Sequence, residues 1–323
     1  MGLTACVLAI DAGNSKTDVA VVAADGNVLA TARGGGFRPP AVGVTAAVDA
    51  LAEAVERAYA AAGVTSVAHV SACLANADLP VEEEQLAAAL HARAWGTTVE
   101  VRNDTFAILR AGAAEPRGVA VVCGAGINCV GMRPDGRTAR FPAIGKISGD
   151  WGGGWHLAEE ALWHAARAED GRGAPSALAR TLPAHFGLDS MYALIEALHL
   201  EHVPHHRRHE LTPVLFATAA AGDPVAHAVV DRLAEEIVVM ATVALTRLDL
   251  LDEETPVLLG GGVLAAGHAR LDDAVRDLLA ARAPKAVPTV VTAPPVLGAA
   301  LLGLDREGVT AGAQERLRAF YVP

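Results

Sequence analysis

The chain has 323 residues, which is enough for about two domains with buried cores. Apolar residues make up 52% of it and charged residues 20%, so the composition is that of a globular protein and not of a disordered one. The formal net charge is −11 with no basic stripe, so we expect neither nucleic acid nor a membrane as a partner. No apolar run approaches the ~20 residues of a membrane span, and Asp11 interrupts the N-terminal run that a signal peptide would need.

The four cysteines lie in apolar, strand-like stretches. They are Cys6, Cys73, Cys123 and Cys129, and no two of them form a C-x-x-C pair. We therefore expect small core residues in a reducing, cytoplasmic protein, and neither a zinc site nor a disulfide framework.

The first third of the chain predicts an α/β unit that opens with antiparallel strands. A short apolar run over 5–11 is typical of a buried strand, and the turn Asp25-Gly26-Asn27 divides 17–34 into two strands. Apolar residues at helical spacing over 43–62 end at Gly63. The remaining elements are a strand over 66–75, a helix over 81–93, a strand over 97–103 and a helix after it.

The same order partly recurs in the rest of the chain. Residues 118–141 again predict strand, glycine turn, strand, turn and strand. Helices follow over 155–168, 174–186, 190–199, 210–221 and 224–250, then a strand over 256–262, a helix over 268–282, a strand over 287–292, and helices over 294–304 and 312–321. Two parts that each open with a hairpin across a glycine turn indicate an internally duplicated fold.

Polar or glycine-rich turns follow three of the predicted strands. In the first, Asp11-Ala12-Gly13-Asn14-Ser15-Lys16-Thr17, backbone N–H groups, hydroxyls and an ammonium could cradle a phosphate, and the carboxylate could hold a metal through water. No Walker A pattern is present, so a plain hairpin turn is the alternative. The turn at 124–128 allows the same two interpretations, and these two turns, one in each half, could clamp one polyphosphate from both sides. The turn at 260–262 is either a nucleotide-binding turn between a strand and a helix or a flexible loop.

Two acidic positions stand beside such turns. Asp104, within Asn103-Asp104-Thr105, follows a strand and precedes a helix, so it is either part of a helix N-cap or a general base at the mouth of a cleft. Asp150 lies in Ser148-Gly149-Asp150-Trp151-Gly152-Gly153-Gly154, where so many glycines favour close approach of the backbone to a ligand. The histidine-rich segment 199–210 fits no metal-ligand spacing, and we interpret it as a solvated loop.

Taken together, these motifs resemble a known family. DAGNSKTD, the ND at 103–104, GAGINCVG, SGDWGGGWHLAEEAL, VLLGGGV and PVLGAALL occur in matching order over residues 11–302. The chain resembles the BadF/BadG/BcrA/BcrD-type ATPases, and within them the N-acetylglucosamine kinase-like branch of the sugar kinase/actin/heat-shock-chaperone superfamily.

The resemblance implies an α/β fold of two ribonuclease H-like domains, of the actin/hexokinase type, around a central cleft that binds ATP and Mg²⁺. The N-terminal domain would span 1–112, with a C-terminal helix at about 305–323 packing back on it. The second domain would span 113–304, with a helical insertion over about 170–222. Residues 103–113 and 294–304 would be two helices that cross at the hinge, and a homodimer is implied.

The resemblance also implies residue roles. Asp11 would hold Mg²⁺, through water, and Asp104 would be the base that takes the proton of the attacked hydroxyl. The ATP-binding residues would be Gly13, Asn14, Ser15, Lys16, Thr17, Gly124, Ala125, Gly126, Gly260, Gly261 and Gly262, with segment 218–223 near the adenine. The acceptor would contact Arg38, Asn76, Asn103, Asp104, Asn128, Gly145, Asp150 and Trp151.

The sequence departs from the family pattern at the presumed sugar wall. Arg38 stands where relatives have an Asn, Asn76 where they have a Gly, and Trp151 where they have an acidic residue. A more positive site would disfavour a cationic acceptor and favour a neutral or anionic one with a C–H face for the indole.

We therefore expect an ATP-dependent kinase that phosphorylates a hydroxyl of a sugar, an amino sugar or a sugar-like small molecule. Two alternatives remain. One is an ATP-hydrolysing activator of 2-hydroxyacyl-CoA dehydratases, which would carry a 4Fe–4S cluster on cysteines at a dimer interface. The other is a sugar-responsive binding protein without turnover, although such a protein would be expected to lose Asp104.

Overall fold

The computed structural model describes residues 6–322, and the first of its two sheets comes from the N-terminal third of the chain. The strands are β1 (Cys6–Ala12), β2 (Thr17–Ala23), β3 (Val28–Gly34), β4 (Val67–Leu74) and β5 (Gly96–Asn103). Their order is β3-β2-β1-β4-β5, antiparallel across the opening hairpins and parallel from β1 to β4 to β5. The carboxyl ends of β1, β4 and β5 therefore meet at one edge.

The second sheet repeats this topology. Its strands are β6 (Gly118–Cys123), β7 (Ile127–Met132), β8 (Thr138–Arg140), β9 (Thr255–Gly260) and β10 (Ala286–Val290), in the order β10-β9-β6-β7-β8. Strands β6, β7 and β8 are antiparallel neighbours, and β6 runs parallel to β9, which runs parallel to β10. The predicted duplication is confirmed strand by strand.

Each sheet has helices on both faces. On the first sheet, α2 (Val44–Ala62) and α3 (Pro80–His91) cover the outer face, and α1 (Pro39–Val42) precedes them. On the second, α9 (Pro224–Arg247) and α11 (Ala269–Arg282) do so. Local signals fix these helices: Gly63 ends α2 in the left-handed conformation, and the Asp223 carboxylate caps α9 by accepting from two backbone N–H groups.

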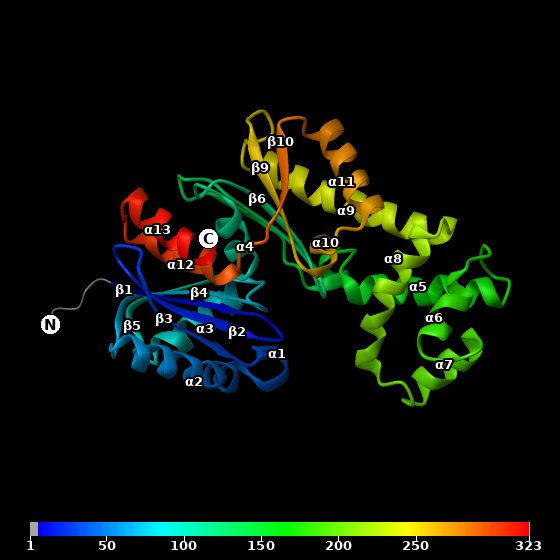
Figure 1. Cartoon of the computed structure of the whole chain (residues 1–323), viewed down its shortest axis with the longest axis horizontal. Coiled ribbons are helices and arrows are strands. Elements are labelled where there is room, and N and C mark those ends of the chain that lie inside the picture. The colour runs from blue at the N-terminus through cyan, green and yellow to red at the C-terminus, as the bar shows by residue number, and fades with distance from the viewer. Residues whose placement is uncertain (1–5, 323) are drawn as a thin grey trace.

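Two crossing helices occupy the space between the sheets. α4 (Thr105–Gly112) follows β5 but packs on β6 and β7, whereas α12 (Pro295–Arg306) follows β10 but packs on β1 and β4. The two helices contact each other closely, and a core cluster joins them to both sheets (Figure 1). The predicted boundary at 304 therefore falls inside a helix that belongs with the first sheet, together with α13 (Ala311–Tyr321).

A helical insertion separates β8 from α9. It comprises the short 3-10 turn η1 (Gly145–Ser148), α5 (Gly154–Glu169), α6 (Leu178–His185), α7 (Met191–His199), the 3-10 segment η2 (His205–Glu210) and α8 (Leu211–Ala220), and a further short helix, α10 (Gly262–Ala265), follows β9. The green helices α5 to α7 extend away from both sheets in Figure 1. The insertion starts earlier than the predicted 170 because η1 and α5 already belong to it.

Cys73, Cys123 and Cys129 are buried free thiols within the sheets. Within residues 6–322, no helix combines the length and the apolar character that crossing a membrane requires.

Candidate active site

The first polar turn lies between β1 and β2 and is braced by its neighbours. The Gly13 N–H donates to the Lys16 carbonyl at 2.9 Å, and the Gly13 carbonyl accepts from the Phe37 N–H at 2.9 Å. The Thr17 hydroxyl donates to the Gly35 carbonyl, while the Lys16 ammonium is 3.0 Å from the Asp18 carboxylate. The Thr17 hydroxyl and the Lys16 ammonium, both predicted to bind phosphate, therefore already have partners within the protein.

The second glycine turn, 124–126, packs against two other glycine segments. The N–H groups of Gly154 and Trp155, in the first turn of α5, donate to the carbonyls of residues 124 and 125. A Cβ on Gly153 would lie 2.4 Å from the Cα of Gly126, and one on Gly261 would lie 2.5 Å from the Cys123 carbonyl. Both glycines have positive φ, so only glycine permits these contacts.

A cavity of about 590 Å³ lies where these loops meet, and we call it the glycine-loop cavity. Its walls come from both halves of the chain: Ser15, Gly124, Ala125, Gly154, Trp155, His209, Thr212, Pro213, Gly262, Val263, Ala266 and His268. Of the third predicted loop, only Gly262 lines it, because Gly260 packs against Ile108 and Gly261 against the strand end. Its lining combines glycine-loop backbone, the Ser15 and Thr212 hydroxyls and the rings of Trp155, His209 and His268, which suits a nucleotide.

A second cavity of about 480 Å³ adjoins the same loops, and we call it the Asp150 cavity. It is lined by Asn14, Ala125, Gly126, Ile127, Ala143, Gly145, Lys146, Asp150, Gly152, Trp155, His156 and Glu159. The Asp150 carboxylate accepts from the Gly145 N–H at 3.0 Å and from the Ser148 hydroxyl at 2.5 Å. The predicted acceptor residues Gly145 and Asp150 thus share one cavity with parts of both phosphate loops.

Asp104 stands at the end of β5, before α4. It makes no side-chain capping hydrogen bond; instead the Asn103 side-chain oxygen accepts from the Thr105 N–H at 2.9 Å. Of the two sequence interpretations, helix capping therefore falls to Asn103 and leaves the Asp104 carboxylate available. Burial raises the pKa of Asp104 to about 6, against the opposing effect of nearby backbone N–H groups.

Asp11 ends β1 and is 8% exposed. It lies opposite Asp18 in the β1–β2 register. Burial, and then the charges of Asp104 and Asp18, raise the pKa of Asp11 to about 7, with Lys16 opposing. Such an excess of negative charge beside a phosphate loop is the environment that a bound cation would relieve.

A chain of hydrogen bonds joins the two domains beside Asp104. The Asn128 side-chain amide on β7 donates to the Asn103 side-chain oxygen at 3.0 Å, and the Asn103 amide donates to the Asp78 carboxylate at 2.8 Å. Asn103 is 2% exposed. Asp78 was not singled out as a site residue from the sequence. Its position two residues beyond Asn76, shortly after a predicted strand, could have indicated it.

Arg38 and Asn76 lie beside the first loop. The Arg38 guanidinium donates to the Asn14 carbonyl at 2.9 Å. The Asn76 amide donates to the Asn14 side-chain oxygen at 3.1 Å and to the Phe37 carbonyl at 3.3 Å. Both side chains therefore brace the predicted phosphate loop in this structure.

The structure contradicts the predicted acceptor role of Trp151. Its side chain is 7% exposed and belongs to the core of the second domain, with the Arg232 guanidinium 4.3 Å above its ring and the His156 ring 4.9 Å away. It lines neither the glycine-loop cavity nor the Asp150 cavity. Trp151 therefore offers no indole face to an acceptor, whereas the cation of Arg38 stays beside the first loop.

The histidine-rich segment is solvated as expected, since all five of its histidines are exposed, but part of it is helical rather than a loop. It forms η2, and His209 lines the glycine-loop cavity with its ring 5.8 Å from that of Trp155. Among residues 6–322, no group of three or more His, Cys, Asp or Glu side chains is arranged to hold a metal ion.

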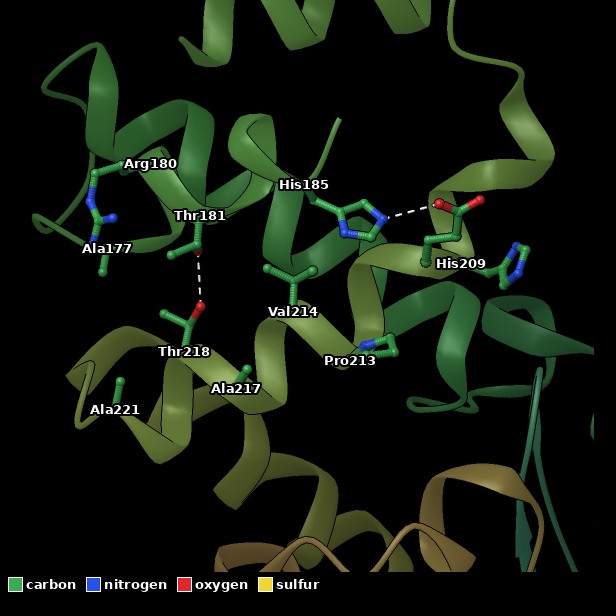
Figure 2. Close-up of a pocket in the computed structure, with 11 residues that line it drawn as sticks. Ala177, Arg180, Thr181, His185, His209, Pro213, Val214, Ala217, Thr218 and Ala221 are labelled. Atoms are coloured by element: carbon green, nitrogen blue, oxygen red, sulfur yellow. Dashed lines mark hydrogen bonds and ion pairs between the residues drawn. The ribbon is translucent and has the colours of Figure 1, made fainter. Parts of the chain in front are cut away.

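Another cavity, of about 650 Å³, lies between α6, η2 and α8 (Figure 2). Figure 2 shows the His185 ring bonded to a carboxylate, that of Glu210 at 3.0 Å, and the hydroxyls of Thr181 and Thr218 bonded to each other. Thr218 and Ala221 line this cavity, and no residue of segment 218–223 lines the glycine-loop cavity, so its placement near the adenine stays a prediction.

Known proteins match the whole chain. An N-acetyl-D-glucosamine kinase of Dictyostelium discoideum is 24% identical over 315 residues, covering 92% of this chain and 97% of the relative. A solved structure assigned as an N-acetylglucosamine kinase of Chromobacterium violaceum is 26% identical with a TM-score of 0.68, covering 93% and 99%. A ROK family glucokinase of Streptomyces griseus, in complex with glucose and AMPPNP, has 18% identity and a TM-score of 0.55, covering 94% and 98%.

These matches confirm the expected class of fold, the actin-like two-domain fold of sugar kinases. The model of the BadF/BadG/BcrA/BcrD ATPase family matches residues 8–303. The chain belongs to that family, as its motifs had indicated.

Proposed function

We propose that this chain is an ATP-dependent carbohydrate kinase whose acceptor is N-acetylglucosamine or a closely related amino sugar. The observation that carries the proposal is Asp104, a carboxylate without a capping bond that stands at the junction of the two domains, next to Asn103 and its hydrogen bond to Asn128. The relatives named N-acetylglucosamine kinase support the substrate class.

The glycine-loop cavity is the proposed nucleotide site. The turns at 13–16 and 124–126 would face the phosphates from opposite domains, and Trp155, His209 and His268 would contact the base. The ring of His268 is stacked on Phe216 at 3.7 Å between centroids, which fixes its orientation. The AMPPNP complex of the ROK glucokinase supports a triphosphate in this fold.

A magnesium ion fits the residues beside the first loop. The Asp11 carboxylate supplies the oxygen ligand that Mg²⁺ prefers, and burial, followed by the charges of Asp104 and Asp18, raises its pKa, an effect that a bound cation would oppose. Asp11 would hold the ion, directly or through water. When bound, Mg²⁺ neutralises charge on the phosphate oxygens.

For the transfer itself, we propose that Asp104 accepts the proton of the attacking hydroxyl. A base with a pKa near 6 is ionised at neutral pH yet close enough to it to take a proton as the bond to phosphorus forms. Asp150, Gly145 and Asn128 would hold the other hydroxyls and so fix which one faces Asp104. Closure of the two domains would exclude water and suppress hydrolysis.

The two alternative functions have less support. Cys73, Cys123 and Cys129 are buried in the sheets, and burial raises the pKa of the Cys123 thiol to about 12, which is unlike an iron–sulfur thiolate at a dimer surface. A binding protein without turnover would not need a general base, which is the role proposed for Asp104. A cytoplasmic location and a homodimer stay predictions, testable by cell fractionation and analytical ultracentrifugation.

ADP release should be measured with a panel of hexoses, amino sugars, N-acetyl amino sugars and cyclitols, and the product analysed by mass spectrometry. N-acetylglucosamine or a related amino sugar should give the highest kcat/KM and a product heavier by one phosphoryl group. Asp135→Asn, a charge change in an exposed turn, is the matched control. ADP release that no sugar accelerates would contradict the kinase.

A further inference from the structure

Asp78 has no role in the proposed chemistry, yet it lies beside it. It follows β4 in the loop before α3 and is half-buried. Burial, and then the charges of Asp104 and Glu82, raise the pKa of Asp78 to about 7, with Arg140 opposing and Asp150 adding to the rise. Asp78 is thus within electrostatic reach of the proposed base and of a proposed acceptor ligand from the other domain.

The backbone around Asp78 is held in place. The N–H groups of residues 78 and 79 donate to the Glu82 carboxylate at 3.0 and 2.9 Å. The Asp78 carbonyl accepts from the Arg140 guanidinium at 3.3 Å, and Arg140 is itself 2.6 Å from the Glu83 carboxylate. The side chain of Asp78 therefore projects from a rigid loop and is free for another use.

The Asp78 carboxyl group is hydrogen-bonded to the side-chain amide of Asn103. The Asn103 NH₂ donates to an Asp78 carboxyl oxygen at 2.8 Å, so the amide nitrogen of Asn103 faces Asp78. The Asn103 oxygen must then face the opposite way, where it accepts from the Thr105 N–H and from the Asn128 amide. Asn128 in turn has its NH₂ fixed toward Asn103 and its oxygen toward the Cys129 N–H at 2.7 Å.

We propose that Asp78 is a positioning residue for the acceptor: its carboxylate sets the amide orientation of Asn103 and, through it, that of Asn128. The inference rests on the proposed function, in which Asn128 holds a sugar hydroxyl. Asn128 belongs to β7 of the second domain, whereas Asp78 and Asn103 belong to the first. The donor and acceptor pattern offered to the sugar by one domain is thus set by a hydrogen-bond acceptor on the other.

A double-mutant cycle tests whether Asp78 affects acceptor binding through Asn128. Asp78→Ala should raise the acceptor KM about tenfold, equivalent to ~1.4 kcal/mol, and leave the ATP KM within twofold. Asp78→Asn keeps an oxygen that can accept from Asn103, so it should restore most of the affinity. In an Asn128→Ala background, Asp78→Ala should have little further effect, because the residue through which it acts is already gone.

Glu84→Gln is the matched control, since Glu84 is an exposed carboxylate on α3, near the same loop. Thermal unfolding of each variant checks that the fold is intact; if Asp78→Ala does not fold, Asp78→Leu replaces it, since leucine fills more of the same space and can accept no hydrogen bond.

Three results would overturn the inference. They are an unchanged acceptor KM in Asp78→Ala, an equal rise in the ATP KM, or a tenfold effect that persists in the Asn128→Ala background. A wild-type chain that phosphorylates no sugar would overturn the proposed function as well, whereas an active wild type with an unaffected Asp78→Ala variant would refute the role of Asp78 alone.

Discussion

The crossing of α4 and α12 leaves no room for a side chain at Gly298, which makes Gly298→Ala a sharp test of the hinge. An added Cβ would lie 1.8 Å from the Ala107 carbonyl oxygen and 2.8 Å from the Ala111 nitrogen, where ordinary contacts begin at 3.4 Å. Because 3.4 − 1.8 is 1.6, the helices would have to separate by about 1.6 Å. Both clashing groups are backbone, so no side chain can move aside.

Overpacking of this kind costs ~1–3 kcal/mol, and a backbone clash belongs at the upper end. The better helix propensity of alanine returns at most ~1 kcal/mol. We therefore expect Gly298→Ala to lose about 2 kcal/mol of unfolding free energy, which is ~4–8 °C in Tm for a domain of this size.

Urea denaturation followed by circular dichroism measures the loss, with Gly312→Ala as the matched control. Gly312 is an exposed residue of α13 with nothing within 4 Å of an added Cβ, so the same substitution there should be neutral or slightly stabilising. The acceptor kcat/KM should also fall in Gly298→Ala, because the helices set how the domains close. A variant as stable as wild type would refute the close crossing.

Asp104→Asn should lower kcat by ~10²–10⁴ with ATP affinity unchanged in calorimetry; turnover within threefold of wild type would exclude the base. In wild type, kcat/KM for the acceptor should fall as pH drops through about 6, because Asp104 then becomes protonated; a flat profile would contradict this. Asp11→Ala should weaken Mg²⁺–ATP binding and spare sugar binding, as calorimetry would show. Asp305→Ala should cost about 3 kcal/mol in urea, because buried Arg110 loses its bidentate partner; a loss below about 1 kcal/mol would contradict this.

Most of the fold could be predicted from local sequence patterns. The apolar run before Asp11, the helix stop at Gly63 and the cap at Asp223 each act over a few residues, so the predicted elements differ from the observed ones by a few residues at most of their ends. The duplicated hairpins indicated the duplicated sheets. The short helix α1 and the segments η1 and η2 were missed, because such short elements leave no periodic signal.

The candidate site was only partly predictable, for a physical reason. Glycine turns and the aspartates after strands mark strand ends, and the topology brings those ends together. The direction of a side chain in a loop depends instead on distant packing: Trp151 turns into the core under Arg232, and His209 reaches the glycine-loop cavity from another helix. Asp78 acquires its partner Asn103 only when β4 pairs with β5.

Because α12 packs on the first sheet but comes late in the sequence, the order of synthesis determines when the inner face of that sheet is covered. The first sheet is complete at Asn103, but the helix that covers its inner face, with Val7, Ala20 and Cys73, begins 192 residues later at Pro295. At ~5–20 residues per second, that apolar face waits about 10–40 s for its cover. We therefore expect the nascent N-terminal sheet to finish folding only after α12 has been synthesised.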